Sequence, residues 1–389
     1  MRPAIAIVGA GIAGLTAALA FGRRGCVVDV FEQSPEFQEV GAGLQLSPNA
    51  TGVLDSLGLG AELGRLWHEP DRLCLLSGTT LRALAHIPMG MIAKNRWRFP
   101  YAVIRRADLQ QALAKTVEAL PHCRLHLGQT IPANPENQTC SDLADISGRK
   151  PDLIVGADGV WSSRRDGIPG SRPAAFSGHI AWRAICDPAD MPFVDSSDDV
   201  HAFLGPGTHL VAYPLGKSGA TNLVAITPGA VSEKGWDATG DPEVLSNHFR
   251  RWHPDITPAL KRITWRYWPL FEARNEVWHT GEKTVLIGDA AHAMTPYAAQ
   301  GAAMAIEDAY ELASCFDRSD GHAAAAIAAY EAVRRPRVRR VRKRGDFNRF
   351  AYHATGPARI ARDLVLRKRG PAGLAAGLDP IHGYRAGAD

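Results

Sequence analysis

The alternation of apolar runs with helical patterns predicts an α/β fold built on a parallel sheet. Four short apolar runs are rich in β-branched residues, which is typical of strands buried on both faces. They lie at residues 4–8, 26–31, 152–157 and 284–287. The first run leads into a glycine-rich turn and then into a helical pattern, Leu15 to Arg24, which Gly25 closes. This order of strand, turn, helix and strand predicts a Rossmann-like unit at the start of the chain.

Residues 171–270 follow a different pattern. Tryptophan and tyrosine gather there, and short alternating strands are separated by turns that contain glycine and proline. We expect an antiparallel sheet with one face free for a pocket. Residues 132–150 predict turns without regular elements. Further on, Val333 to Phe350 predict a basic helix whose charged face is solvated and which Pro336 bends.

The glycine-rich turn carries the pattern of a dinucleotide site. Gly9, Gly11 and Gly14 form a Gly-x-Gly-x-x-Gly sequence between the first strand and the helix. Glycine there allows a tight turn, close approach of a pyrophosphate and helix–strand packing, and the helix N-terminus favours phosphate. Glu32 follows Gly14 by 18 residues and can accept both ribose hydroxyls. Because an acid there repels a 2′-phosphate, NAD and FAD remain as candidates.

Two later strand ends repeat the arrangement of a buried run followed by an acid. Asp158 is followed by a glycine, and Asp289 opens a small-residue stretch that continues through Gly301 and Ala302. A carboxylate at such an edge can hold a sugar hydroxyl, and backbone N–H groups beyond it can hold a ring carbonyl. The two acids in this order favour FAD. The sequence has neither a second glycine motif nor a Cys-x-x-Cys pair, so a nicotinamide cofactor would bind only transiently.

From Ile5 to about Arg344 these motifs resemble those of the class A flavoprotein aromatic hydroxylases, the family of salicylate hydroxylase, 3-hydroxybenzoate 6-hydroxylase and 6-hydroxynicotinate 3-monooxygenase. The resemblance implies an α/β fold with a Rossmann-like FAD-binding domain of the GR2 type, an inserted antiparallel-sheet substrate domain and C-terminal helices. The expected FAD-binding domain covers residues 1–75, 100–170 and 271–350, the substrate domain covers 76–99 and 171–270, and a helical tail covers 351–389.

The same resemblance implies a set of residues that bind FAD. They are Gly9, Gly11, Gly14, Glu32, Arg106, Asp158, Asp289, Gly301 and Ala302. The glycines and Glu32 would hold the ADP half, and Arg106 would lie near the ribose and pyrophosphate. Asp158 would serve both FAD and NAD(P)H. Asp289 would contact the ribityl chain, while Gly301 would lie beside the isoalloxazine ring.

Catalytic residues are expected on the strand at residues 209–214. His209, Val211 and Tyr213 alternate along it and therefore share one face. An imidazole and a phenol on that face could bind or deprotonate a substrate phenol, so His209 and Tyr213 are the candidate catalytic residues and Val211 a candidate substrate contact. The alternative for His209 is a histidine that is only hydrogen-bonded within the sheet.

The other substrate-binding candidates come from three separate segments. Arg183 could pair with a substrate carboxylate, with a surface or interdomain arginine as the alternative. Gln45, in the segment 41–49, and the pair Pro296 and Tyr297 would contact the ring. The 6-hydroxynicotinate enzymes carry histidine at the places of Gln45 and Tyr297. Glutamine cannot act as a base, so this difference disfavours hydroxynicotinate as the substrate.

The resemblance implies an FAD-dependent aromatic-ring monooxygenase of the EC 1.14.13 type. NADH or NADPH would reduce FAD, O₂ would then give a flavin C4a-hydroperoxide, and this species would hydroxylate a phenolic, carboxylate-bearing and salicylate-like compound. One alternative is an FAD-dependent oxidoreductase of the same fold that transfers no oxygen. Another is a non-catalytic flavin-fold protein whose exposed basic helix docks on a partner.

Composition and charge narrow the partners. The 389 residues are 46% hydrophobic and 22% charged, which is ordinary for a globular protein. The net charge of the chain is +4, but residues 331–370 alone carry +11, so the basic residues are confined to one segment. A nucleic-acid-binding protein would usually present a basic groove on its folded domain, so nucleic-acid binding is disfavoured. Glycines interrupt the uncharged stretch 4–22, which argues against a membrane span.

The 6 cysteines are scattered and suggest neither a metal site nor disulfide bonds. We therefore expect a cytoplasmic enzyme that uses FAD, NAD(P)H, O₂ and a small aromatic substrate. No metal, nucleic acid or membrane is expected, and a homodimer is left open.

Overall fold

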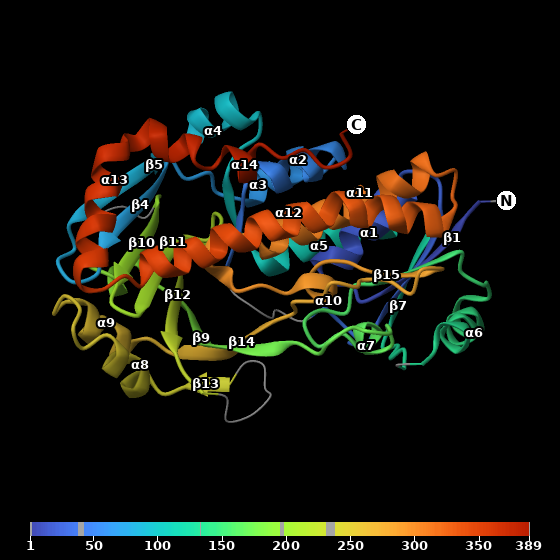
Figure 1. The fold of residues 1–389 in the computed structure, drawn as a ribbon, viewed down its shortest axis with the longest axis horizontal. Coiled ribbons are helices and arrows are strands. Elements are labelled where there is room, and N and C mark those ends of the chain that lie inside the picture. Colours follow the sequence, from blue (N-terminus) through green and yellow to red (C-terminus); the bar gives the residue numbers. More distant parts are fainter. Residues whose placement is uncertain (1, 38–42, 133, 195–197, 231–237, 389) are drawn as a thin grey trace.

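The molecule contains two large sheets along its long axis, a small two-stranded sheet and a long helix, α12 (Ala323–Tyr352), that runs beside both large sheets (Figure 1). The computed structural model describes residues 2–37, 43–132, 134–194, 198–230 and 238–388. Within these ranges, none of the helices combines the length and the hydropathy that a membrane span requires.

The first sheet is parallel and has the strand order β15-β8-β1-β2-β7. Its strands are β1 (Ala4–Val8), β2 (Val27–Glu32), β7 (Cys123–Leu127), β8 (Leu153–Gly156) and β15 (Thr284–Leu286). The end of β1 pairs with β2 at Phe31 and with β8 at Gly156, so the three strands end in register. β2 and β7 lie on one side of β1, and β8 and β15 lie on the other. This reversal of the strand order at β1 creates the crevice in which α/β proteins bind ligands.

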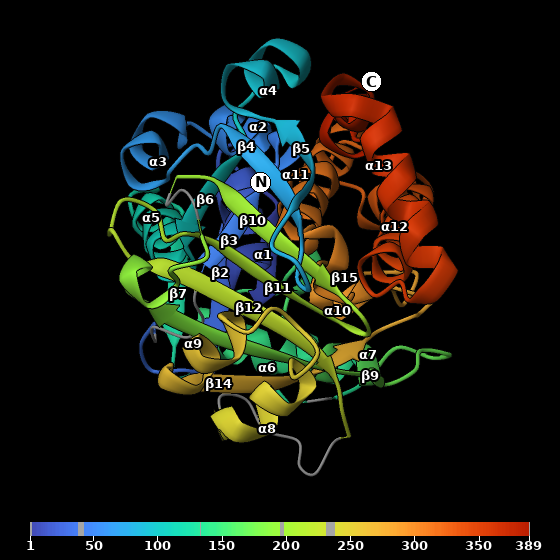
Figure 2. The ribbon, with the colours of Figure 1, turned by 90° about the vertical axis from the view of Figure 1, so that its left-hand side faces the viewer.

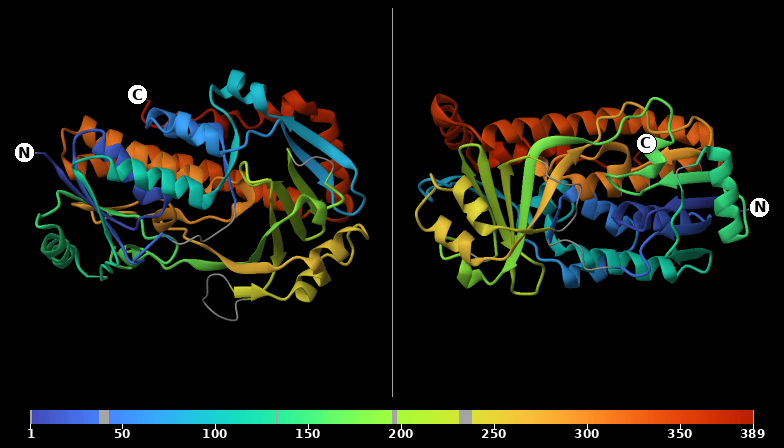
Figure 3. Two further views of the ribbon diagram at one scale, coloured as in Figure 1. Left: turned by 180° about the vertical axis from the view of Figure 1, so that it is seen from behind. Right: turned by 90° about the horizontal axis from the view of Figure 1, so that it is seen from below.

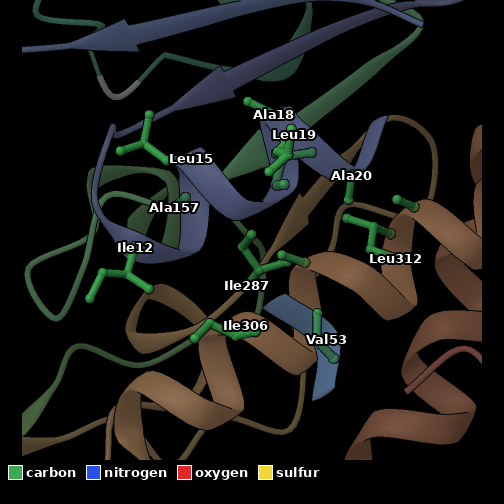
Figure 4. Packing of buried hydrophobic residues seen from close by; sticks show 14 of the residues in the cluster. Ile12, Leu15, Ala18, Leu19, Ala20, Val53, Ala157, Ile287, Ile306 and Leu312 are labelled. Carbon is green, nitrogen blue, oxygen red and sulfur yellow. The ribbon is translucent and has the colours of Figure 1, made fainter. Parts of the chain in front are cut away.

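Helices cover both faces of the parallel sheet. One face carries α1 (Ile12–Gly22), α5 (Arg106–Glu118) and α11 (Gly301–Arg318), and the other carries α6 (Glu136–Ser147). Leu19 of α1 and Leu312 of α11 lie in one buried cluster with the strands (Figure 4). On the opposite face, Cys140 and Leu143 of α6 pack against Ile154 of β8. The parallel sheet is therefore buried on both faces, as its apolar strands predicted.

The second sheet has eight strands in the order β13-β14-β9-β12-β11-β10-β4-β5. They are β4 (Arg72–Ser77), β5 (Ala83–Pro88), β9 (Ala175–Cys186), β10 (Val200–Gly205), β11 (Thr208–Pro214), β12 (Thr221–Pro228), β13 (Ala238–Gly240) and β14 (Trp265–Glu272). Neighbouring strands are antiparallel except for β10 and β4, which run parallel.

The two faces of the second sheet have different neighbours (Figure 2). One face packs through Phe203, Leu210 and Trp265 against α8 (Pro242–His248) and α9 (Ile256–Arg262). The other face carries the alternate residues of β11 and packs against aromatic residues from the segment after β15 and from α12. This second face is the one that turns toward the parallel sheet.

The remaining elements lie between those already named or follow α12. They are β3 (Gly43–Leu46), α2 (Pro48–Ser56), α3 (Gly60–Leu66), α4 (Gly90–Trp97), β6 (Ala102–Arg105), α7 (Ser163–Asp166), η1 (Pro188–Asp190), α10 (Asp289–His292), η2 (Pro296–Ala298), α13 (Gly356–Ala376) and α14 (Asp379–His382). The views from behind and below show α12 passing from one sheet to the other (Figure 3).

The predicted fold class is confirmed, with several local corrections. The first helix begins at Ile12, because the glycine turn already ends at Gly11, its N-cap. Residues 136–147 form a helix rather than turns, since Cys140 and Leu143 supply an apolar side for the sheet. The second sheet is not wholly antiparallel and extends to β4 and to the end of β14, across the expected limits at residues 75 and 270. The division into domains remains a prediction.

The basic helix also differs from its prediction. The expected solvated charged face is present at Arg339, Arg340 and Lys343, but Arg334 is 0% and Arg337 is 3% exposed. Arg334 pairs with Glu307 and Asp308 of α11, and Arg337 pairs with Glu307. Both acids are completely buried as well. A run of basic residues does not indicate which acids it will contact, and these acids lie 26 or more residues earlier in the chain. The pairing therefore could not be predicted from the sequence.

Candidate functional site

The ends of the parallel strands bring the predicted cofactor motifs together. β1 leads into Gly9, β8 into Asp158 and β15 into Asp289, while Glu32 is the last residue of β2. Because neighbouring strands pair in register up to these ends, the four motifs lie at one edge of the sheet. This edge lies beside the crevice on either side of β1, where a dinucleotide is expected.

The glycine turn leaves its backbone open to a phosphate. A Cβ on Gly9 would lie 2.4 Å from the Ala157 carbonyl oxygen, and a Cβ on Gly14 would lie 1.9 Å from the Gly9 carbonyl oxygen, so neither position accepts a side chain. Around Gly11, by contrast, an added Cβ would meet nothing within 4 Å beyond its chain neighbours. The N-terminus of α1 there has no side-chain cap and no acid in its first turn. This leaves its N–H groups for an anion.

Glu32 is fixed against the glycine turn. Its Oε2 accepts a hydrogen bond of 2.7 Å from the Ala10 N–H, and its Oε1 accepts one of 3.0 Å from the Ser34 N–H. Gln110 of α5 donates to the Ala10 carbonyl at 2.9 Å and holds the turn from the other side. A carboxylate oxygen has a second lone pair, so Glu32 can still accept a ribose hydroxyl.

Asp158 has one satisfied and one unsatisfied oxygen. Its Oδ2 accepts hydrogen bonds from the Ser163 hydroxyl at 3.2 Å and from the Arg164 N–H at 3.1 Å, but the buried Oδ1 has no partner. A buried acceptor without a partner is unfavourable and is satisfied when a ligand or water donates to it. Arg165 donates to the Ala290 carbonyl at 3.1 Å and thereby ties this motif to the one that carries Asp289.

Asp289 stands out from its surroundings. Its side chain is exposed, whereas both neighbours in sequence, Gly288 and Ala290, are buried. The protein atoms packed around the carboxyl desolvate it and raise the pKa of Asp289, although the nearby His292 and Arg106 counteract this effect. Arg106, the first residue of α5, is therefore close enough to Asp289 to act on it electrostatically, while its expected contact with the ribose and pyrophosphate stays a prediction.

The segment from Asp289 to Gly301 is anchored at both ends. The Gly288 N–H donates to Asp308 Oδ2 of α11 at 2.8 Å. At the other end, Gln300 caps α11 without a side-chain hydrogen bond to it, and an added Cβ on Gly301 would meet nothing within 4 Å. Gly301 and the half-buried Ala302 thus offer open backbone at a helix N-terminus, which suits a ring carbonyl that develops negative charge.

A buried charge network lies behind this segment and was missed by sequence reasoning. Arg334 pairs with Glu307 and Asp308 at 2.7 Å each, and Arg337 pairs with Glu307 at 2.7 Å. Desolvation acts against the ionised carboxyls, but Arg334 and Arg337 outweigh it and lower the pKa of Glu307. The network continues to Asn49, whose amide donates to Glu307 at 2.5 Å. It fixes α11 and the cofactor segment against α12.

The second sheet presents a polar group of predicted substrate residues. Arg183 of β9 is desolvated, which lowers its pKa, and its buried Nε has no hydrogen-bond partner. Burial raises the pKa of Tyr213 to about 12, while Arg183, Gln45 and Asn222 act in the opposite direction. Gln45 lies in β3 and accepts a hydrogen bond of 2.5 Å from the Tyr101 hydroxyl. Residues 41 and 42 of the expected entry segment lie outside the described residues.

His209 lies in a cluster of aromatic side chains on the same face. Its ring centre is 5.4 Å from that of Tyr297, 5.4 Å from that of Tyr352 and 5.1 Å from that of His353. His209 Nδ1 and His353 Nε2 are 2.9 Å apart and share a hydrogen bond. No local pattern pointed to His353, because it follows a basic helix and lies 144 residues from its partner.

Tyr297 joins the cofactor segment to the sheet. It is buried in a cluster with Ala181 of β9 and Ile226 of β12, and its hydroxyl has no hydrogen-bond partner. Pro296 begins the short η2 turn that positions it. Val211 is half-buried on the same sheet face. The structure therefore brings the substrate candidates to one face, next to the segment between Asp289 and Gly301.

These features fit FAD. The open approaches at Gly11 and Gly301 suit the pyrophosphate and the ring carbonyl, respectively. The unpartnered Asp158 oxygen and the exposed Asp289 carboxylate suit hydroxyl groups between them. Acids at strand ends, glycines at the turns and a free helix N-terminus are the donor and acceptor set of a dinucleotide rather than of a metal.

Comparisons with known proteins agree with this site. A model of the FAD binding domain family matches residues 2–345. The 3-hydroxybenzoate 6-hydroxylase of Klebsiella oxytoca is 33% identical, over 97% of this chain and 96% of that protein. The 3-amino-4-hydroxybenzoate 2-monooxygenase PtnB3 of Streptomyces platensis is 35% identical, over 93% of this chain and 92% of that protein.

Solved structures show the same fold. A salicylate hydroxylase in a substrate complex superposes with a TM-score of 0.80 at 22% identity, over 99% of this chain and 96% of that one. Together with the family match over residues 2–345, these similarities show that the chain belongs to the FAD binding domain family of class A flavoprotein aromatic hydroxylases, with FAD as its cofactor.

Proposed function

We propose that this FAD-dependent monooxygenase hydroxylates a phenolic ring that carries a carboxylate, as salicylate and the hydroxybenzoates do. The observation that carries the proposal is the position of Tyr297. It belongs to the segment between Asp289 and Gly301, and it packs on the sheet face that carries His209 and Arg183. A ring bound between this segment and the sheet would lie beside the cofactor and the candidate base at once.

Arg183 is the candidate partner of the substrate carboxylate. Among the described residues Arg183 pairs with no acid, and its desolvated, buried Nε has no hydrogen-bond partner, which is unfavourable until an anion binds. The Arg183 guanidinium also lies 5.2 Å from the Trp268 ring centre, a contact that fixes its plane. A carboxylate would satisfy this cation through charge-assisted hydrogen bonds.

Tyr213 and His209 are the candidate partners of the substrate phenol. Because the pKa of Tyr213 is about 12, its hydroxyl stays protonated near neutral pH and can donate a hydrogen bond to a phenolate oxygen. Burial, together with the nearby His353 and His179, keeps the pKa of His209 well below its usual value. Its imidazole is therefore neutral and can accept the phenol proton, which makes the ring electron-rich.

When bound, FAD supplies the redox chemistry, accepting hydride from NADH or NADPH and activating O₂ for transfer to the ring. The chain itself has to orient the ring and limit the access of water. Val211, Val224 and Ile226 line the sheet face with apolar side chains between the polar ones. Such a surface protects a reactive oxygen species from water and reduces loss of the oxygen as peroxide.

The alternatives have less support. Both curated relatives described above bear the names of ring-oxygenating enzymes, so an oxidoreductase that transfers no oxygen is not favoured. The basic helix exposes Arg339 and Lys343, but its Arg334 and Arg337 pair with acids of α11 inside the core, a structural role that docking on a partner does not explain. Gln45 and Tyr297 stand where the hydroxynicotinate enzymes carry histidine, so hydroxybenzoates are preferred over hydroxynicotinate.

We also propose the wider setting in which the enzyme works. The FAD-binding parts are residues 1–75, 100–170 and 271–350, the substrate sheet is 76–99 and 171–270, and 351–389 form the tail. NAD(P)H binds transiently, with Asp158 as a contact. The enzyme is placed in the cytoplasm and acts as a homodimer.

The test is a panel of ring substrates with the FAD-loaded protein. NADH and NADPH oxidation would be followed with salicylate, 3-hydroxybenzoate, 3-amino-4-hydroxybenzoate and 6-hydroxynicotinate, and products identified by mass spectrometry. The expected result is strong acceleration by one of the three benzoates, together with its hydroxylated product. Benzoate, which lacks the phenol, is the control and should give no product. If no phenolic acid yields an oxygenated product, the proposal is wrong.

A further inference from the structure

We propose that His353 relays the phenol proton of the bound substrate from His209 to solvent. This inference rests on the proposed function, and it adds a residue from the expected C-terminal tail to the machinery that handles protons. His353 would not touch the substrate. It would act through His209, as a positioning and relay residue.

The first observation is the pairing of the two imidazoles. His209 Nδ1 and His353 Nε2 are 2.9 Å apart, and their ring planes are inclined by 44°. This hydrogen bond occupies Nδ1 of His209 and leaves its Nε2 for a substrate hydroxyl. Two imidazoles joined in this way can transfer one proton between them without moving the backbone.

The second observation is a gradient of exposure across the pair. His209 is 3% exposed and lies inside the aromatic cluster of the sheet face, whereas His353 is half-exposed at the end of α12. A buried base that accepts a proton has to release it before the next turnover. His353 is the hydrogen-bonded neighbour of His209 that reaches the outside.

The third observation is an open depression in front of His353. Its volume is about 460 Å³, which holds many water molecules. It is lined by His179 of β9, Arg349 near the end of α12, His353, Thr355 and Ala358 at the start of α13, among others. The depression therefore places bulk water against the outer imidazole of the pair.

The proton balance of the relay is simple. The substrate O–H bond breaks as His209 Nε2 takes its proton, and the proton on His209 Nδ1 passes to His353 Nε2. The other ring nitrogen of His353 then gives its proton to water in the depression. No electrons are transferred, both imidazoles end neutral, and the phenolate keeps the electron pair of the broken bond.

The surroundings of the two imidazoles disfavour a proton that stays on either ring, so the proton is passed on to solvent. Desolvation of the His353 imidazole lowers its pKa to about 4. His179 of β9 and Arg349 of α12 act in the same direction, because they oppose a positive charge on His353. The negative charge of Glu272 of β14 has the opposite effect and acts to raise the pKa of the neighbouring His179 and of Tyr297. Since the pKa of His209 is low as well, neither imidazole holds the proton near neutral pH.

Tyr297 and Tyr352 complete the surroundings of His209 but cannot replace His353. Burial raises the pKa of both phenols, so each keeps its proton near neutral pH. A structural role for His353 is the competing explanation, because its N–H donates to the Arg349 carbonyl at the end of α12. That bond comes from the backbone and survives a change of side chain, which makes the two roles separable.

The experiment compares three variants of the FAD-loaded enzyme. His353→Ala removes the outer imidazole, His353→Gln keeps a hydrogen-bonding side chain that cannot relay a proton, and Thr355→Ala is the matched control from the same depression. Each is mixed with 3-hydroxybenzoate in weakly buffered solution with phenol red, and proton release on binding is followed by stopped flow. The hydroxylation rate is measured from pH 5.5 to 8.5 in H₂O and D₂O, with and without added imidazole.

The relay predicts that both His353 variants bind FAD and 3-hydroxybenzoate normally but release the proton roughly 10- to 100-fold more slowly, part of the 10²–10⁴-fold effect of a positioned base. Their rates should rise with pH, show a larger D₂O effect and, for His353→Ala, recover with imidazole, which can enter the open depression. The Thr355→Ala control should match the parent, because Thr355 lines the depression but takes no part in the hydrogen bond that joins the two imidazoles.

The inference is overturned if His353→Ala releases the proton at the parental rate, or if the slow variant is neither rescued by imidazole nor more sensitive to D₂O. Failure of the proposed function has a different signature. The parent enzyme itself would then hydroxylate no phenolic acid, whereas failure of the relay leaves hydroxylation intact in the parent and in the His353 variants.

Discussion

The buried ion pairs that Arg334 forms with Glu307 and with Asp308 give the sharpest prediction about stability. All three side chains are 0% exposed, and the guanidinium contacts each acid at 2.7 Å. Arg334→Leu fills a similar volume with apolar atoms but leaves two carboxyls without their main counter-charge. A buried carboxylate that loses its partner has to be ionised at high cost or become protonated.

The magnitude can be worked from the carboxyls. Desolvation tends to raise the pKa of Asp308, but His292 and Arg334 outweigh it and lower the pKa from 3.8 to about 2. At 1.36 kcal/mol per unit, this corresponds to about 2 kcal/mol of stabilisation. A lowered folded-state pKa stabilises above pH 3.8 and loses its effect as the pH falls through about 2, so the contribution is complete at pH 7. With the second acid included, removing the guanidinium should cost about 3–5 kcal/mol at pH 7.

The assay is urea unfolding of the FAD-loaded protein at pH 7, followed by tryptophan fluorescence, with FAD affinity measured in parallel. FAD should bind more weakly to Arg334→Leu, because Asp308 also accepts the hydrogen bond from the Gly288 N–H beside Asp289. Arg339→Leu is the control from the same helix. Arg339 is 60% exposed and pairs with Glu276, so its loss should change stability by less than about 1 kcal/mol. A change below about 1 kcal/mol for Arg334→Leu as well would refute the reasoning.

Four further substitutions test the site. Asp289→Ala should weaken FAD binding at least about tenfold in a fluorescence titration, since a charge-assisted hydrogen bond contributes roughly 1.5–3 kcal/mol; unchanged affinity would remove Asp289 from the site. Gly14→Ala places a Cβ 1.9 Å from the Gly9 carbonyl oxygen and should destabilise the fold by about 2–4 kcal/mol in thermal unfolding, so a parental midpoint would contradict the packing. His209→Ala should retain FAD but lower hydroxylation roughly 10²–10⁴-fold, and a parental rate would exclude its role as a base. Arg183→Gln should raise KM for 3-hydroxybenzoate roughly 10- to 100-fold but leave phenol oxidation little changed, whereas equal effects on both would argue against a carboxylate contact.

The fold was predictable where local pattern and tertiary role coincide. The run at 4–8, the glycine turn and the acid at Glu32 specify a strand, a phosphate-binding turn and a second strand over a short stretch of chain. The helix at 136–147 was missed because its apolar residues, such as Cys140 and Leu143, are few and its N-cap, Pro135, offers no capping side chain. The parallel pairing of β10 with β4 depends on contacts between distant segments and carries no local signal.

The candidate site shows the same limit. Residues within motifs, such as Asp158 and Asp289, could be named from the sequence because strand ends of a parallel sheet meet at one edge. The neighbours that set their chemistry could not. His353 meets His209 from the far end of the chain. Arg334 meets Asp308 inside the core, although Arg334 lies in the segment 333–350, whose composition suggested only a solvated helix.

The central claim is that the enzyme inserts an oxygen atom from O₂ into a phenolic ring held between the FAD segment and the second sheet. The most direct test is turnover of 3-hydroxybenzoate, salicylate and 3-amino-4-hydroxybenzoate with NADH or NADPH under ¹⁸O₂, followed by mass spectrometry of the product. We predict a hydroxylated product heavier by one ¹⁸O atom in place of ¹⁶O, and no label when ¹⁸O is supplied in water. NAD(P)H consumption that yields only peroxide for all three acids, or a label that comes from water, would contradict the account.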